Sequence, residues 1–225
     1  MIHYAYILIL AFTLSYPLLK SFEDKIRFYT KWKFLFPAII ITAVFFIAWD
    51  IWFTNQGVWA FNHEAVVGLF ICGLPVEEWL FFFITPFSCV FIHEVLLYFV
   101  KKDLPEMYTR FITIAISVIC LLLAALNYDR IYTMVVFSLL SVALLIHHFI
   151  IRSNYLGRFY ITWAVCIIPF LLVDGMITGI PIVTYNSLEI TNIRIFTIPA
   201  EDLFYGMLQI LQVISIYEYL KQKRV

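Results

Sequence analysis

The sequence predicts an all-α membrane protein with seven transmembrane helices, arranged as two parallel three-helix repeats joined by a linking helix. Three observations lead to this fold class. Of the 225 residues, 64% are hydrophobic and only 13% are charged, whereas soluble domains carry about 25% charged residues. Seven segments are apolar over most of their length. The rare polar residues of the chain recur in a second copy, at a fixed distance from the first.

The seven segments each approach the length of about 20 apolar residues that a helix needs to cross a bilayer. In chain order they are residues 2–20, 34–53, 75–100, 111–126, 131–151, 159–179 and 199–220. The first lacks the basic amino-terminal region and the small-residue cleavage site of a signal peptide, so we expect a retained helix. The fourth is the shortest.

Basic residues in the connecting segments predict how the helices are oriented. If the chain crosses the membrane seven times, 13 of the 15 lysines and arginines fall on one side. These are Lys20, Lys25, Arg27, Lys31, Lys33, Lys101, Lys102, Arg110, Arg152, Arg158, Lys221, Lys223 and Arg224, against Arg130 and Arg194 on the other side. Short loops rich in lysine and arginine stay in the cytoplasm. We therefore expect a multi-pass protein of a bacterial cytoplasmic membrane, with its N-terminus outside and its C-terminus cytoplasmic.

The repeat is most visible in two acidic motifs. Pro75-Val76-Glu77-Glu78 recurs as Pro199-Ala200-Glu201-Asp202, a shift of 124 residues. The same shift carries Asp50 onto Asp174, Asn62 onto Asn186 and Glu94 onto Glu218. We therefore divide the chain into a first repeat (residues 1–105), a linking helix (residues 106–127) and a second repeat (residues 128–225). The first repeat and the linking helix together cross the membrane an even number of times, so the second repeat begins on the same side as the first. The two repeats are therefore parallel and related by an axis near the membrane normal.

Parallel repeats place both acidic motifs at similar depth near the outer face. Acidic residues in a membrane are costly and usually functional, and we predict that Glu77, Glu78, Glu201 and Asp202 are catalytic. We expect a surrounding set of pocket or supporting residues: Asp50, Asp174, Asn62, Asn186, Trp49, Phe61, Tyr185, Trp79, Phe82 and Tyr205. Glu94 and Glu218 lie 17 positions after Glu77 and Glu201, about 25 Å along a helix. Because they lie close to cytoplasmic lysines, we expect them to be structural groups that either snorkel to the interface or form ion pairs.

Two connections, residues 54–74 and 180–198, are long for a helix bundle. The stretch from Leu188 to Ile198 alternates in part between polar and apolar residues, which indicates a short hairpin or a re-entrant segment. Non-helical backbone at membrane depth must pack on protein or line a cavity. We expect both connections to cap the acidic pocket.

Several classes of function are not supported by the sequence. The formal net charge is zero, which argues against a nucleic-acid partner. No glycine-rich nucleotide motif is present, and the cysteines and histidines lack metal-ligand spacing. A retinal protein would need a lysine in a late helix, but no lysine lies between Lys102 and Lys221. We therefore predict no cofactor and no metal.

The two acidic motifs with their aromatic continuations, Glu78-Trp79-Leu80-Phe81 and Asp202-Leu203-Phe204-Tyr205, resemble the paired PxE(E/D) motifs of the membrane-integral lycopene cyclases. These enzymes are also called heterodimer-type cyclases, and this chain resembles their fused form over nearly its whole length. The resemblance implies a lycopene β-cyclase of carotenoid biosynthesis, an isomerase that uses no cofactor. Its substrate would be lycopene or a related acyclic carotenoid taken from the lipid bilayer. A carboxylic acid would protonate the ψ end group, the cation would close a ring, and a base would remove a proton to leave a β-ionone ring.

Three alternatives remain open at this point. Relatives of these cyclases include carotenoid hydratases. A proton-coupled transporter would use buried carboxylates as a relay, although it needs acids spaced through the membrane rather than gathered at one side. The chain could also be a structural part of a larger complex, and a homo-oligomer is not excluded.

Overall fold

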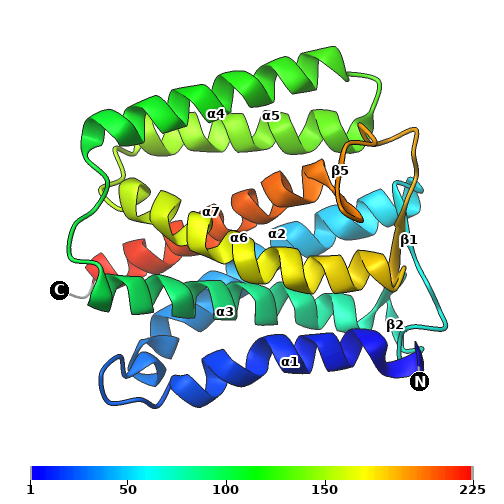
Figure 1. The fold of residues 1–225 in the computed structure, drawn as a ribbon, viewed down its shortest axis with the longest axis horizontal. Helices are drawn as coiled ribbons and strands as arrows, with labels where there is room; N and C mark the ends of the chain where they lie inside the picture. Colours follow the sequence, from blue (N-terminus) through cyan, green and yellow to red (C-terminus); the bar gives the residue numbers. More distant parts are fainter. Residues whose placement is uncertain (1, 224–225) are drawn as a thin grey trace.

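A computed structural model describes residues 2–223, so Arg224 of the basic tail lies outside the described residues. Over this range the chain forms seven α-helices (Figure 1). They are α1 (Ala5–Lys20), α2 (Trp32–Asn55), α3 (Val76–Phe99), α4 (Glu106–Leu126), α5 (Ile131–Leu145), α6 (Leu156–Gly179) and α7 (Ala200–Gln222). A short 3-10 helix precedes each of α1 and α2, and a π-helical segment, Ile146–Ile150, continues α5.

The seven predicted helices are present, and, when the π-helical segment is counted with α5, every bound except the start of the fourth lies within three residues of the prediction. The first begins at Ala5 and has 16 residues, so it is shorter than the six segments that are long and apolar enough to cross a membrane, one of which is α5 together with its π-helical continuation (Ile131–Ile150, 20 residues). The fourth was predicted to begin at residue 111 but begins at Glu106, directly after Pro105. The proline and the acidic first turn favour a helix start there, although both are too polar to count as part of an apolar span. Six long apolar helices mark the chain as a membrane protein.

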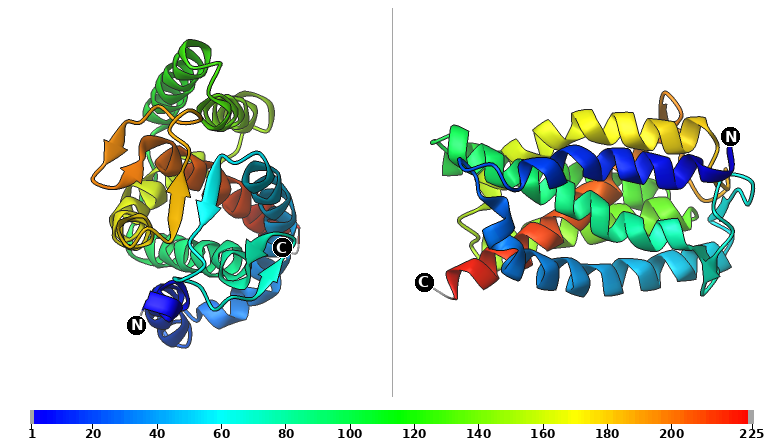
Figure 2. Two further views of the ribbon diagram at one scale, coloured as in Figure 1. Left: turned by 90° about the vertical axis from the view of Figure 1, so that its right-hand side faces the viewer. Right: turned by 90° about the horizontal axis from the view of Figure 1, so that it is seen from below.

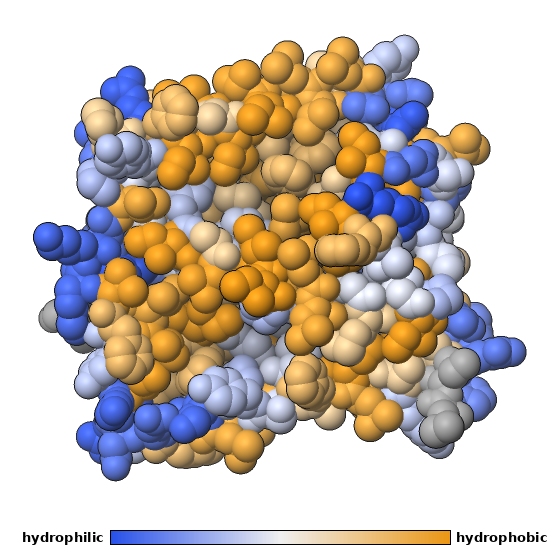
Figure 3. Space-filling view, in the orientation of Figure 1, coloured by the Kyte–Doolittle hydropathy of each residue, from blue (hydrophilic) through white to orange (hydrophobic). Residues whose placement is uncertain are grey.

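The surface has the pattern expected of such a protein. In Figure 3 a broad hydrophobic band covers the middle of the molecule, and hydrophilic residues gather at its two ends. The described termini lie at opposite ends of the bundle (Figure 1). All of the short strands lie at the end that carries the N-terminus, where the connections after α2 and α6 close over the bundle (Figure 2).

The strands form three two-stranded sheets: β1 (Trp59–Phe61) with β4 (Val183–Tyr185), β2 (Phe70–Ile71) with β3 (Leu74–Pro75), and β5 (Arg194–Ile195) with β6 (Ile198–Pro199). The β5–β6 pair confirms the hairpin expected between residues 188 and 198. It matches the β2–β3 pair at every position under the shift of 124 residues.

The β1–β4 pair joins the two repeats to each other. It is antiparallel, and Ala60 lies opposite Thr184, its own counterpart under the shift. Beside this pair the backbone bonds are reciprocal. The amide of Asn62 donates to Ile182 O, and the amide of Asn186 donates to Val58 O, both at 2.8 Å. The internal repeat therefore extends from the sequence to individual hydrogen bonds, and these two strands meet as equivalent partners.

The opposite end of the bundle carries an ion-paired cluster. Glu94, buried on α3, accepts hydrogen bonds from Lys31, from Lys221 at 2.9 Å and from the Tyr217 hydroxyl at 2.6 Å. Glu218 pairs with Lys221 at 2.8 Å. Both glutamates are thus ion-paired as the sequence predicted, and they join α3 and α7 to each other and to the 3-10 helix that precedes α2, away from the acidic motifs.

Gly157, in the first turn of α6, packs directly against the start of α4 and the residues that lead into it. A Cβ atom at this position would lie 2.9 Å from Leu104 O and 3.0 Å from Thr109 Oγ1. We expect Gly157→Ala to destabilise the protein by about 1–3 kcal/mol, because the contact is with backbone that cannot yield easily. Thermal unfolding in detergent measures this. Gly175→Ala is the control, since its nearest neighbour, a side-chain methyl, would lie at 3.8 Å; equal midpoints for the two variants would contradict the prediction.

Candidate active site

The local sequence places two acidic side chains at the start of each of two helices. Pro75 and Pro199 precede the first residue of α3 and α7, in an extended conformation. Proline suits such a position because the first amides of a helix have no partner within it. Glu77 and Glu78, and likewise Glu201 and Asp202, fall in the first turn, where the helix dipole favours negative charge.

One acid of each pair faces a central cavity of about 400 Å³, a volume in the range of small-molecule sites. Glu78 and Asp202 line it, and so do Asp50 from α2 and Asp174 from α6. All four side chains are buried. Carboxyl groups from both repeats therefore converge on one apolar space.

Neighbouring hydroxyl and indole groups donate hydrogen bonds to three of these carboxyls. Tyr6 donates to Glu78 at 2.6 Å and Trp59 Nε1 donates to Asp50 at 2.7 Å. Asp202 accepts hydrogen bonds from two phenol hydroxyls, that of Tyr132 at 2.6 Å and that of Tyr185 at 2.7 Å. Burial, and then the charge of Asp202, raises the pKa of Tyr185 well above its usual value, so this hydroxyl keeps its proton and remains a donor.

The fourth carboxyl, that of Asp174, accepts no side-chain hydrogen bond from residues 2–223. Its Oδ2 atom is buried without a partner, and the equivalent atom of Asp50 is too. Two more polar atoms on the cavity wall, Thr85 Oγ1 and Gln209 Nε2, are also buried and unpartnered within the described chain. Buried polar groups are nearly always satisfied in a stable core, so exceptions point to a functional site.

The other acid of each pair binds the capping loops. Glu77 Oε1 accepts the amide of Val67 and Glu201 Oε1 accepts the amide of Thr191, each at 2.6 Å. Thr133 also donates to Glu201, at 2.7 Å. Both side chains are 0% exposed, and neither is among the residues that line the cavity. Their predicted catalytic role stays a prediction, but their contacts are those of groups that hold the loops in place.

The remaining predicted site residues separate into two groups. Phe61, Tyr185 and Tyr205 line the cavity. The wall does not include Trp49, Trp79, Phe82, Asn62 and Asn186. The two asparagines instead shape the loops: their Oδ1 atoms accept the amides of Glu64 and Leu188, two residues on. As expected, both connections cap the pocket, through Trp59 and Phe61 on one side and Val183 and Tyr185 on the other.

Sequence reasoning missed Tyr6 and Tyr132, the two phenols that donate to Glu78 and Asp202. They are related by a shift of 126 residues rather than 124, because the first helices of the two repeats are offset by two residues. Aligning those helices separately would have paired the two tyrosines. Trp59, the indole that donates to Asp50, was not among the predicted site residues either.

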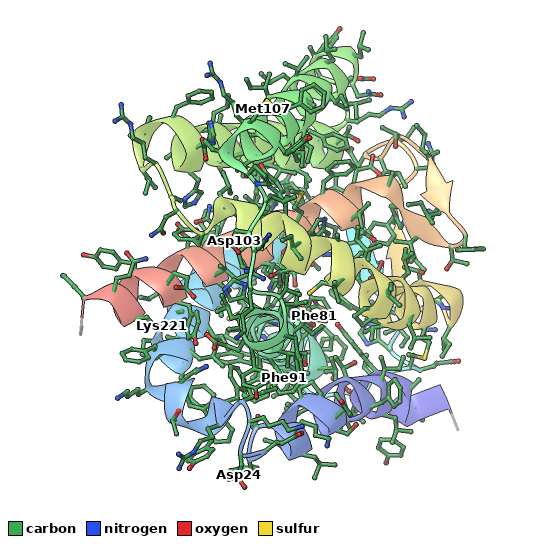
Figure 4. All side chains as sticks on the ribbon, turned by 60° about the vertical axis from the view of Figure 1, so that its left-hand side comes forward. Asp24, Phe81, Phe91, Asp103, Met107 and Lys221 are labelled. Atoms are coloured by element: carbon green, nitrogen blue, oxygen red, sulfur yellow. The ribbon has the colours of Figure 1, made fainter. Side chains whose placement is uncertain are left out.

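The rest of the cavity is mostly apolar and aromatic, and it extends along the bundle away from the acids. Phe81 and Phe91 lie on α3, in the middle of the bundle (Figure 4), and both line it. At its open side it reaches Phe12 and Tyr16 of α1 and Leu172 of α6, which are 58%, 64% and 53% exposed. A recess between α1 and α6 is visible on this face in Figure 3. The opening thus lies on the hydrophobic band.

Fold and site together define a polytopic membrane protein that gathers carboxyl groups in an apolar cavity, with an opening on its hydrophobic surface. The family model for lycopene cyclase matches residues 3–96 and, a second time, residues 129–220, which together make up most of the chain. The chain therefore belongs to the lycopene cyclase family. No curated protein and no solved structure matches it. Membership supports a function in carotenoid cyclisation and implies a carotenoid substrate.

Proposed function

We propose that this protein is a lycopene β-cyclase, which closes the ψ end groups of lycopene to β-ionone rings. The observation that supports this best is the convergence of four buried carboxyls from both repeats on one apolar cavity. The reaction needs an acid, a base, exclusion of water and stabilisation of a cation, and no oxidant or reductant. Because one proton is added, another is removed and nothing else is gained or lost, the reaction is an isomerisation.

The hydrogen bonds suggest how the acid and base roles are divided. Donors to a carboxyl group favour its charged form. Asp202, which accepts two phenol hydroxyls, is best suited to stay ionised and act as the base. Asp174, whose carboxyl receives no side-chain donor within residues 2–223, is best suited to carry the proton as the acid. Charged and neutral carboxyls side by side are a familiar way to combine both roles in one site.

In this proposal Asp174 adds its proton to the terminal double bond of the ψ end group and leaves a tertiary cation. The next double bond attacks that cation, which forms the ring bond and moves the charge into the ring. Asp202 then removes a ring proton, and a new ring double bond forms. Aromatic faces stabilise cations, and Trp59, Tyr185 and Tyr205 surround the acids.

The orientation in the membrane is also part of the proposal. The lysine-rich end with the Glu94 cluster would face the cytoplasm of a bacterial cell, and the strand-capped end with the acids would face outside. The cavity opening between α1 and α6 then lies within the bilayer. That position suits a long apolar polyene that does not leave the lipid.

Isolated membranes containing this chain, supplied with lycopene in D₂O, would test the proposal. We expect cyclic products in which each ring carries one deuterium, because the added proton comes from solvent through the acid and a different proton is lost. Chromatography with mass spectrometry measures both. A product heavier by water would instead indicate a hydratase. Unchanged lycopene, with the protein present and folded, would contradict an acid-catalysed cyclase and favour the transporter or the partner-dependent alternative.

A further inference from the structure

The molecule has a second groove that is the counterpart of the catalytic cavity. It has a volume of about 350 Å³ and lies between α2, α5 and α7. A shift of 124 residues carries its Thr42, Phe45 and Phe46 onto Cys166, Pro169 and Phe170, which line the first cavity. On the other wall, Ser88 and Ile92 of the first cavity correspond to Gln212 and Ile216 of the second.

The two spaces differ in what they reach. The first is lined by all four central carboxyls, whereas none of the acidic residues of the described chain lines the second. Within the described chain the repeat thus forms two corresponding spaces, and of these two only the first reaches the carboxyls.

Two departures from the repeat explain the difference. Val173, on the wall of the first cavity, corresponds to Trp49, and Gly206 corresponds to Phe82. Trp49 and Phe82 are 5% and 1% exposed, and we call them the aromatic plug. Both pack against Phe46 at the inner end of the second groove, with ring centroids 5.6 Å and 6.4 Å apart.

The plug is also held from the side of the acids. The ring of Tyr205, which lines the first cavity, lies 5.1 Å from that of Trp49 and 5.2 Å from that of Phe46. The open side depends on small residues in the same way. A Cβ atom at Gly206 would lie 3.2 Å from Trp163 and 3.4 Å from Phe170, so a larger side chain there would press on these two rings of the cavity wall.

We infer that the aromatic plug gives this enzyme a single entrance, between α1 and α6, and that the polyene presents one end group at a time through it. The inference rests on the proposed function. Trp49 and Phe82 close the repeat-related path between α2 and α5, and Val173 and Gly206 keep the working path open. These four positions decide which side of the molecule takes up substrate.

The test moves a plug residue from one side of the molecule to the other by substituting Val173 and Trp49. The variants are expressed in lycopene-accumulating bacterial cells, and cyclic pigment is measured per amount of folded membrane protein. Val173→Trp alone should lower cyclic product at least about tenfold. Adding Trp49→Val should restore it to within about threefold of the wild type, because substrate then reaches the acids through the second groove. A merely structural defect at position 173 would not be rescued by enlarging space on the other side.

A second pair of variants, Gly206→Leu alone and Gly206→Leu with Phe82→Gly, tests the same path at different positions. The inference is judged on the pair of variants in which both proteins accumulate in the folded state. Rescue in that pair supports the single entrance. A folded double variant no better than its single variant, or a single variant with full activity, would overturn it. If the wild type itself formed no ring, the proposed function would fail instead, so the two failures are distinguishable.

Discussion

Replacing Asp174 or Asp202 by asparagine is expected to lower the rate of ring formation by a factor of about 100 to 10,000, the usual contribution of a positioned acid or base. Asparagine has nearly the same shape, but it can neither supply the proton that starts the reaction nor remove the one that ends it. Product formation in lycopene-containing membranes measures the loss.

The control for these variants is Glu64→Gln, which removes a carboxyl from an exposed position in the capping connection of the first repeat. It should retain the wild-type rate. If Asp174→Asn and Asp202→Asn retained it as well, these two carboxyls would have no part in the chemistry. Loss in one and not the other would assign acid and base to a different pair, with Glu78 and Asp50 the remaining carboxyls on the cavity wall.

Glu94→Gln is expected to destabilise the fold by about 3 kcal/mol, because it leaves the charge of Lys31 without its buried partner and that of Lys221 with Glu218 alone. Glu94 joins lysines from two different segments of the chain, so its charge cannot be replaced by a local rearrangement of one side chain. Thermal unfolding in detergent or nanodiscs measures the change.

A matched comparison is Glu23→Gln, which breaks an exposed ion pair with Lys20. Exposed pairs contribute little, so this variant should unfold at the wild-type temperature. The prediction for Glu94 would be contradicted if both variants unfolded together. In either case ring formation by the surviving folded protein should persist, since Glu94 lies outside the cavity.

Much of the architecture could be predicted because the rare polar residues carry the repeat. In an apolar chain, most hydrophobic positions tolerate exchange, whereas acids such as Asp50 and Asp174 are retained only where they are needed. Their common shift predicted that both sets would meet at one depth. The structure brings Asp50, Glu78, Asp174 and Asp202 to one cavity.

The division of labour within each acidic pair could not be predicted. Adjacent residues on a helix point in directions about 100° apart, so the sequence implies only that Glu77 and Glu78 differ in role. Which one faces the cavity depends on where the Val67 amide lies, and that depends on the folded loop. Likewise, the sequence alone does not tell whether Trp49 belongs to the wall of the first cavity or, as part of the aromatic plug, closes the second groove.

The antiparallel β1–β4 pair has a consequence for the origin of this chain. Ala60 opposite Thr184, with reciprocal bonds on either side, is the contact that two identical molecules make about a two-fold axis. An ancestor that consisted of one half alone could therefore have formed a homodimer through this strand. Gene fusion would then have let the two halves diverge. One half kept an accessible cavity, while bulky aromatic residues came to occupy the equivalent position in the other half.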